Sequence, residues 1–237
     1  MLTIPRTRTL LAAAALTLAG AAAHAQSLLD ASTYGSLVGT NAATVNGVSF
    51  SAVGGNFGTK TLNGYGGLGV TGGASGNEID VGESITMSFA ATVIADFTVA
   101  LLYNGPEFGD YLEIAQVDVY NGAMLLGSYT LSVGNDGAMP GALWTGPGGA
   151  VSNLSPPDAG GGAAWLVSGN PFGNAAATKL VFSAVTSAGC QTPGACTNQS
   201  DYVLTSVTAV PEPGTYALLA AGLGVVGFMA RRRRAAV

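Results

Sequence analysis

Two short acidic segments hold the side chains best suited to chemistry. In the first, Asn77-Glu78-Ile79-Asp80, one residue separates the two carboxylates. On an extended chain Glu78 and Asp80 project from the same face, and such a pair repels unless a cation lies between them. Calcium prefers oxygen ligands, and carbonyls of the preceding glycine-rich segment could complete its shell. The pattern allows a calcium site, but it favours two solvated carboxylates at a loop end.

The second acidic segment runs from Asn104 to Glu113 and also contains Glu107 and Asp110. Turn residues place Glu107 and Asp110 on a loop, where they could join the first calcium site or form another. These carboxylates could also be the acid pair of a glycoside hydrolase, which needs about 5 to 10 Å between carboxyl groups. A polar turn with solvated charges is the simpler interpretation, and the pattern favours it.

Histidine is absent from residues 26–210, which excludes a Ser-His-Asp triad, a Cys-His pair and a histidine zinc site there. In the same range the only cations are Lys60 and Lys179, against twelve carboxylates. The whole chain has a formal charge of -5 and an isoelectric point near 4.6. Such an acidic chain lacks the basic face that nucleic-acid binding requires, so no nucleic-acid partner is expected.

Cys190 and Cys196 lie close together in the segment G-C-Q-T-P-G-A-C. In an exported protein an even pair of cysteines predicts a disulfide. Two free thiols, or half of a metal site, are the alternatives.

Glycines and aromatic residues suggest two further kinds of binding. The spacing Gly64-x-Gly66-x-x-Gly69 matches the dinucleotide fingerprint, but it opens no predicted helix, so no nucleotide is expected. Aromatic rings could stack on sugars. For the two tryptophans, whose neighbours are apolar, a place in the core is favoured. The aromatic candidates are Tyr65, Tyr103, Tyr111, Trp144 and Trp165.

Short alternations of apolar and polar residues dominate the chain between residues 30 and 210. A period of two is typical of strands with one buried face, and it occurs at 48–52, 85–89, 97–101, 115–119, 129–133, 180–184 and 203–207. We predict an all-β fold, a two-sheet antiparallel β-sandwich of jelly-roll or Greek-key type with about 8 to 10 strands. An open barrel or β-helix is the alternative. The glycine-dense residues 54–77 and 134–163 are expected to form long loops.

The N-terminal residues have the three parts of a secretory signal peptide. Arg6 and Arg8 precede an apolar run from Leu10 to Ala23, and Ala23-His24-Ala25 places small residues before a cleavage site at Gln26. A buried core helix is the less suitable alternative. We expect residues 1–25 to be removed on export.

The C-terminal residues combine a helix breaker, an apolar run and a cationic end. Pro211-Glu212-Pro213 is followed by an uncharged stretch from Tyr216 to Ala230. Four arginines then follow, namely Arg231, Arg232, Arg233 and Arg234. The apolar run is marginal for spanning a bilayer of about 30 Å, and the positive-inside rule keeps the arginines cytoplasmic. We therefore predict a transmembrane helix that anchors the folded part in the inner membrane, facing outward.

This order of features resembles the PEP-CTERM sorting signal, on the strength of Val210-Pro211-Glu212-Pro213, the glycine-containing apolar helix and the arginine cluster. The segment is also described as an ice-binding protein C-terminal motif, a label that implies no ice binding. The resemblance implies export in a Gram-negative bacterium and cutting near the proline pair by an exosortase, a membrane cysteine protease. It further implies release to the cell surface, outer envelope or extracellular polysaccharide.

These observations divide the chain into a signal peptide (1–25), a β-sandwich domain (26–209) and a sorting signal (210–237). We expect the domain to be a non-enzymatic binding module, with polysaccharide as its ligand and calcium as its only possible cofactor. One alternative is a self-associating matrix or adhesion protein, because strands with few charges at their edges favour association. The other is the carboxylate-based hydrolase.

Overall fold

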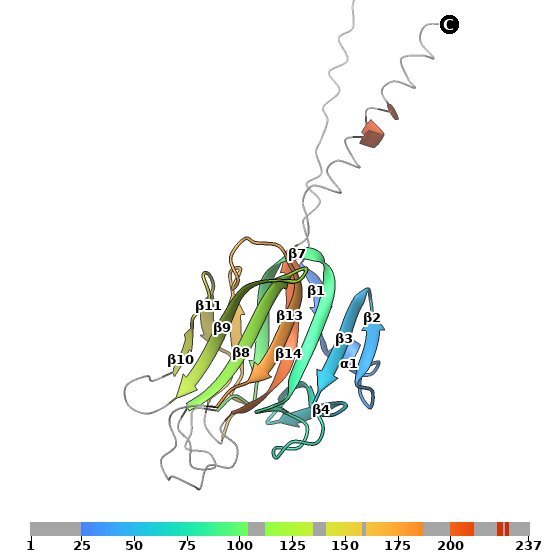
Figure 1. The fold of residues 1–237 in the computed structure, drawn as a ribbon. Coiled ribbons are helices and arrows are strands. Elements are labelled where there is room, and N and C mark those ends of the chain that lie inside the picture. The colour runs from blue at the N-terminus through green and yellow to red at the C-terminus, as the bar shows by residue number, and fades with distance from the viewer. Residues whose placement is uncertain are drawn as a thin grey trace, which may run out of the picture.

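The computed structural model describes residues 25–103, 112–134, 141–157, 160–186 and 200–210, together with the helical residues 222–224 and 226–227. The described residues between 25 and 210 form fourteen β-strands and one short helix (Figure 1). The helix, α1 (Ala31–Tyr34), begins where the Asp30 side chain accepts a hydrogen bond from the backbone N–H of Ser32.

The strands are β1 (Gln26–Leu29), β2 (Ala42–Val45), β3 (Val48–Val53), β4 (Phe57–Leu62), β5 (Tyr65–Val70), β6 (Ile79–Asp80), β7 (Ser84–Ala100), β8 (Leu112–Asn121), β9 (Met124–Gly134), β10 (Gly141–Trp144), β11 (Ala150–Asn153), β12 (Trp165–Ser168), β13 (Ala177–Ala184) and β14 (Asp201–Val210).

The seventeen-residue strand β7 belongs to two groups of strands. Its first half pairs with β3 and β13, and its second half pairs with β12 and β14. The change of partners falls between Thr92 and Val93, just after the exposed Ala90 and Ala91. On either side of this point the apolar residues alternate with polar ones, so each half buries one face.

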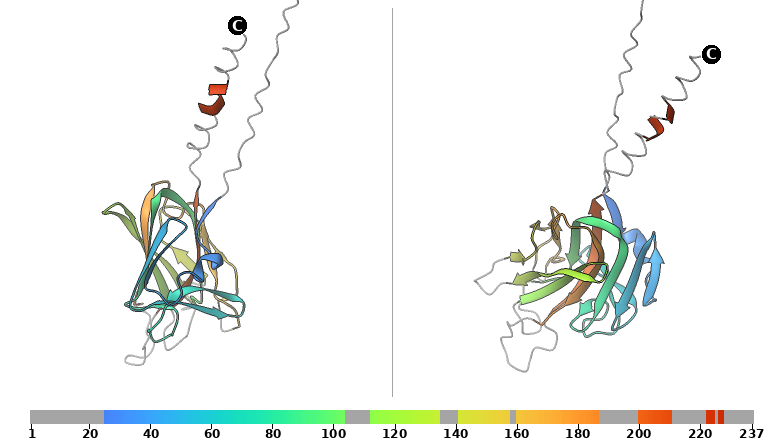
Figure 2. Two further views of the ribbon diagram at one scale, coloured as in Figure 1. Left: turned by 90° about the vertical axis from the view of Figure 1, so that its right-hand side faces the viewer. Right: turned by 45° about the horizontal axis from the view of Figure 1, so that its top comes forward.

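Two antiparallel groups of strands result, and β7 joins them. The first has the order β2-β3-β7-β13-β8-β9-β10. The second has the order β11-β12-β7-β14-β5-β4, with β1 and β6 also paired to β14. Figure 2 shows the two groups from two further directions.

The core lies between these groups. Phe97, from the second half of β7, contacts Phe182 of β13 with ring centroids 5.8 Å apart and Trp144 of β10 at 5.2 Å. Its ring also stacks on Phe172, which is in the loop before β13. One continuous cluster of buried apolar residues includes members of both groups.

The predicted all-β, antiparallel architecture is confirmed. The jelly-roll order is not confirmed, because the two groups share one continuous strand. The structure also corrects the predicted loops: the glycine-dense residues 54–77 contribute β4 and β5, and residues 134–163 contribute β10 and β11. In the part of the chain that the structure describes, no helix is long and apolar enough to cross a membrane. The signal segment and most of the predicted anchor lie outside the described residues.

Candidate functional site

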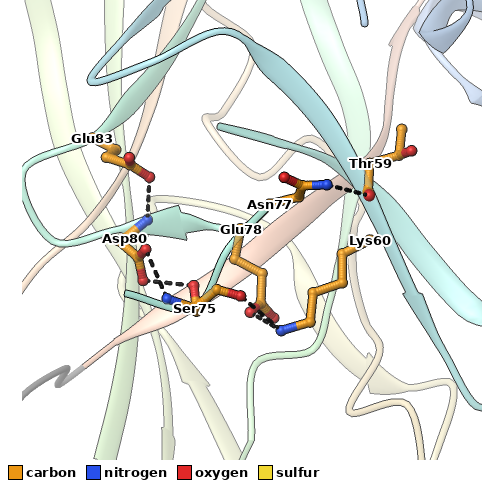
Figure 3. Close-up of polar contacts among 7 residues, drawn as sticks. All are labelled: Thr59, Lys60, Ser75, Asn77, Glu78, Asp80 and Glu83. Carbon is orange, nitrogen blue, oxygen red and sulfur yellow. Dashed lines mark hydrogen bonds and ion pairs between the residues drawn. The ribbon is translucent and has the colours of Figure 1, made fainter. Parts of the chain in front are cut away.

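Glu78 forms a buried ion pair with Lys60 (Figure 3). Only 2% of the Glu78 side chain is exposed, against 38% of Lys60, which projects from β4. The Lys60 ammonium also donates a hydrogen bond to the carbonyl of Ser75 at 3.1 Å. Burial raises the pKa of Glu78, and hydrogen bonding and charge attraction from Lys60 oppose that change. The pair therefore stabilises a carboxylate that burial would otherwise disfavour.

Asp80 is held by the turn that precedes β6. Its carboxylate accepts hydrogen bonds from the hydroxyl of Ser75 at 2.7 Å and from the Ser75 backbone N–H at 3.2 Å. The backbone N–H of Asp80 donates in turn to the Glu83 carboxylate at 3.0 Å (Figure 3). A Cβ on Gly73 would collide with the Asp80 carboxylate, so this turn needs glycine there.

These contacts bear on the predicted calcium site. Glu78 and Asp80 are both buried, so the favoured interpretation of two solvated carboxylates is wrong. The cation beside Glu78 is the Lys60 ammonium. Among the described residues no three metal-ligating side chains converge. Glu107 and Asp110 lie outside the described residues, so calcium binding that involves them stays a prediction.

Lys60 was missed as a site residue by the sequence analysis. The available signal was compositional: a domain with two lysines and many carboxylates has reason to place a lysine against a buried acid.

Glu113, a member of the predicted hydrolase set, is buried and accepts a hydrogen bond from the backbone N–H of Tyr103. The neighbouring Ile114 N–H donates to the Ser200 hydroxyl at 2.9 Å. Each described carboxylate of the two acidic segments thus binds a donor of the protein itself.

Trp165 is a core residue, as favoured, and Trp144 is half-buried against the core. Trp165 is buried and its indole N–H donates to the Leu102 carbonyl at 2.9 Å. Trp144 packs on Phe97, and its indole N–H donates to the Gly148 carbonyl at 3.0 Å. Of the other aromatic candidates, Tyr65 is exposed, Tyr103 is nearly buried, and Tyr111 lies outside the described residues.

The glycines of β5 allow backbones to approach closely. A Cβ on Gly67 would lie 2.5 Å from the Leu204 carbonyl oxygen, and a Cβ on Gly69 would collide with the Asn77 carbonyl oxygen. Gly64 takes a positive φ of 82° in the turn between β4 and β5. The fingerprint-like spacing therefore belongs to a hairpin and a strand crossing.

A neutral groove lies between α1 and the hairpin of β4 and β5, with a volume of about 650 Å³. Tyr34 contributes to its wall and anchors α1, because its hydroxyl donates to the Thr205 carbonyl of β14. Burial raises the pKa of Tyr34 above its ordinary value. The lining residues are Ala31, Tyr34, Gly35, Val38, Thr59, Thr61, Gly64, Gly66 and Gly67.

Replacing Lys60 by methionine should lower the free energy of unfolding by about 2 kcal/mol at pH 7. The loss is smaller than for a fully buried ion pair, because the Lys60 side chain is partly exposed. Without Lys60 the raised pKa of Glu78 should rise further, so the folded state binds a proton more tightly than the unfolded chain. Stability is then recovered as the pH falls below that pKa. Urea titrations at pH 7 and pH 5 measure the free energy of unfolding of both proteins. If Lys60→Met lowered that free energy equally in a Glu78→Gln background, the loss would not come from the ion pair and the prediction would be wrong.

The chain enters and leaves the fold at neighbouring positions. Gln26 of β1 pairs with Ala209 of β14, and Val210 ends β14. Ala25 precedes β1 without regular structure. The remaining predicted processing, topology and disulfide residues lie outside the described residues, namely Ala23, Pro211, Glu212, Pro213, Arg231, Arg232, Arg233, Arg234, Cys190 and Cys196.

Together, the strand network and its adjacent chain ends define an all-β domain followed directly by a C-terminal segment. That segment, residues 209–234, matches the family model of the PEP-CTERM protein-sorting motif. The chain is therefore an exported protein whose sorting depends on an exosortase and which is transiently anchored in a membrane. No curated protein and no solved structure matches the chain.

Proposed function

We propose that residues 26–209 form a non-enzymatic binding module that takes neutral polysaccharide in the groove between α1 and β4–β5. The observation that supports this proposal is the composition of that groove. Its lining has two threonine hydroxyls, a tyrosine ring and glycine backbone, and no charged side chain. Apolar surface with a few polar groups suits sugar rings, and the volume is within the range of ligand sites.

The state of the carboxylates supports a non-enzymatic role. A general acid or base needs a carboxyl group that can reach a substrate. Glu78 is paired with Lys60, and Glu113 is bound to the Tyr103 N–H. Asp80 accepts from Ser75. These contacts suit structural carboxylates better than the acid pair of a glycoside hydrolase.

Self-association is the second candidate, and the edge strand β4 bears on it. Part of its outer edge is covered, because the Phe57 N–H donates to Thr40 and the Asn77 amide donates to the Thr59 carbonyl at 3.1 Å. Lys60 also lies on this strand. Covered and charged edges disfavour pairing between copies. Polysaccharide binding after delivery to the cell surface or matrix is therefore the function we favour.

Binding of the signal-processed chain in detergent to neutral polysaccharides tests the proposal. The variant Thr59→Glu/Thr61→Glu places two charges in the groove and should weaken binding about tenfold or more. The matched control is Thr44→Glu, an exposed strand threonine on β2, and its binding should be unchanged. Equal binding by all three proteins, or no binding by the unmodified chain, would refute polysaccharide binding in the groove. Sedimentation that increases with concentration without sugar would favour self-association.

A further inference from the structure

The folded domain is connected to its sorting signal at one end. The Thr92 hydroxyl, at the bend of β7, donates to the carbonyl of Val210 at 3.2 Å. Both chain ends depart from this end of the strands, as Figures 1 and 2 show. We call it the exit end.

The β8–β9 hairpin also reaches the exit end. Ala177 of β13 pairs with Thr92, and the next residue, Thr178, accepts a hydrogen bond from the Gly122 N–H at the hairpin turn at 2.8 Å. Going from β14 through β7 and β13 to β8 crosses three strand spacings, roughly 14 Å. The hairpin turn therefore lies at the same end of the strands as the point where the chain leaves the fold.

The tip of this hairpin has exposed apolar residues just after the Asn121 and Gly122 of its turn. Met124 is 62% exposed and Leu125 is 50% exposed, and as successive residues of β9 they project from opposite faces of the hairpin. Just below them the Lys179 ammonium lies 3.7 Å from the centre of the Tyr120 ring. Apolar residues above an aromatic residue and a lysine are typical of segments that enter a membrane interface. Asp118, the nearest carboxylate of β8, lies two residues further from the tip and accepts from Gln116.

Charge is distributed along the strands in a way that fits this orientation. The buried carboxylates lie at the opposite end: Asp201 begins β14 and pairs with Asp80, while Glu83 precedes β7 and Glu113 is the second residue of β8. Asp96, which pairs with Thr208, lies nearer the exit end, so the described acids are concentrated at the far end but not confined to it. Anionic lipid therefore repels the far end more strongly than the exit end.

The link to the apolar segment is short. Five residues, 211–215, separate Val210 from the apolar stretch that starts at Tyr216. Fully extended, they span at most about 18 Å. While the apolar stretch is in the bilayer, the exit end must lie near the lipid headgroups, within reach of the hairpin.

We propose that Met124 and Leu125 insert into the membrane interface while the sorting signal anchors the protein, so that the domain stands end-on with its acidic end outward. The occupant of the apolar tip is the anionic lipid surface itself. This contact is a second, weak attachment that orients the domain during processing. It is independent of the groove and of any polysaccharide ligand.

Quenching by brominated lipids tests the proposal. The signal-processed chain with its sorting signal is reconstituted into vesicles of phosphatidylethanolamine and phosphatidylglycerol, with Leu125→Trp as the probe variant. The matched control is Val53→Trp, since Val53 is 60% exposed and ends β3 at the far end of the strands. Trp144 and Trp165 contribute equally to both variants. Brominated lipid should quench the L125W signal about twofold or more beyond that of V53W.

Three outcomes would overturn the proposal. Equal quenching of the two variants would show that the hairpin tip does not contact lipid. A blue shift of the L125W fluorescence without quenching would show that the tip contacts a second copy of the chain, provided that the shift weakens as the protein is diluted in lipid. Quenching that persists in L125W when Met124 is also replaced by serine would show that the apolar tip does not drive insertion.

Discussion

Replacing Phe97 by alanine is expected to lower the free energy of unfolding by about 4 kcal/mol, the largest effect we predict for a single side chain. Phe97 is fully buried and contacts Trp144, Phe172 and Phe182. Its removal leaves a cavity between the two strand groups and separates three aromatic partners. Urea denaturation followed by tryptophan fluorescence measures the loss, because Trp144 reports on the same cluster.

The matched control for Phe97→Ala is Phe89→Ala. Phe89 is on the same strand, half-buried near the bend of β7. It buries less apolar surface, so its loss should be about 1 to 2 kcal/mol. Similar losses at both positions would show that the cluster around Phe97 is not the centre of the core.

Gly69→Ala is expected to destabilise the domain by about 3 kcal/mol, or to prevent folding. The added Cβ would collide with the carbonyl oxygen of Asn77, and a backbone atom cannot rotate away as a side chain can. Moving Asn77 also moves Glu78, so the Lys60 ion pair should weaken with it. Thermal melts of the signal-processed chain give the shift.

Gly35→Ala is the control that separates this collision from a general cost of losing glycine. Gly35 ends α1 with helical dihedrals, and a Cβ there would meet nothing within 4 Å. Its free energy of unfolding should change by no more than about 0.5 kcal/mol. If both alanine variants melted at the same temperature, the close crossing of β5 over Asn77 would be disproved.

Periodicity in the sequence predicted most of the long strands. The alternations at 115–119, 129–133 and 180–184 fall inside β8, β9 and β13. The runs at 85–89 and 97–101, predicted as separate strands, are two halves of β7. Periodicity breaks where a strand changes its buried face, so a bent strand resembles two strands in the sequence.

The glycine-rich segment was predicted wrongly for a related reason. Glycine has no side chain to alternate, so β5 (Tyr65–Val70) shows no period of two. Its pairing with β4 depends on backbone hydrogen bonds and on the strand that crosses it. Neither contribution can be deduced from local composition.

For the candidate site, the sequence identified Glu78 and Asp80 as unusual but not their environment. A lysine eighteen residues away contacts Glu78, and a serine five residues away holds Asp80. Burial depends on how β4 and β6 come together, and the same two carboxylates on an open loop would be solvated.

By itself, the sequence determined the acidic charge, the lack of histidine between residues 26 and 210, the strand content and the sorting motif at the C-terminal end. These depend on composition, period and local order along the chain. Tertiary structure alone decided that Lys60 neutralises Glu78, that β7 joins two groups of strands, and that the tip of the β8–β9 hairpin lies at the same end of the strands as the exit to the sorting signal. The reason is that burial and proximity arise from contacts between residues far apart in the chain, whose free energies depend on distance and solvent exclusion.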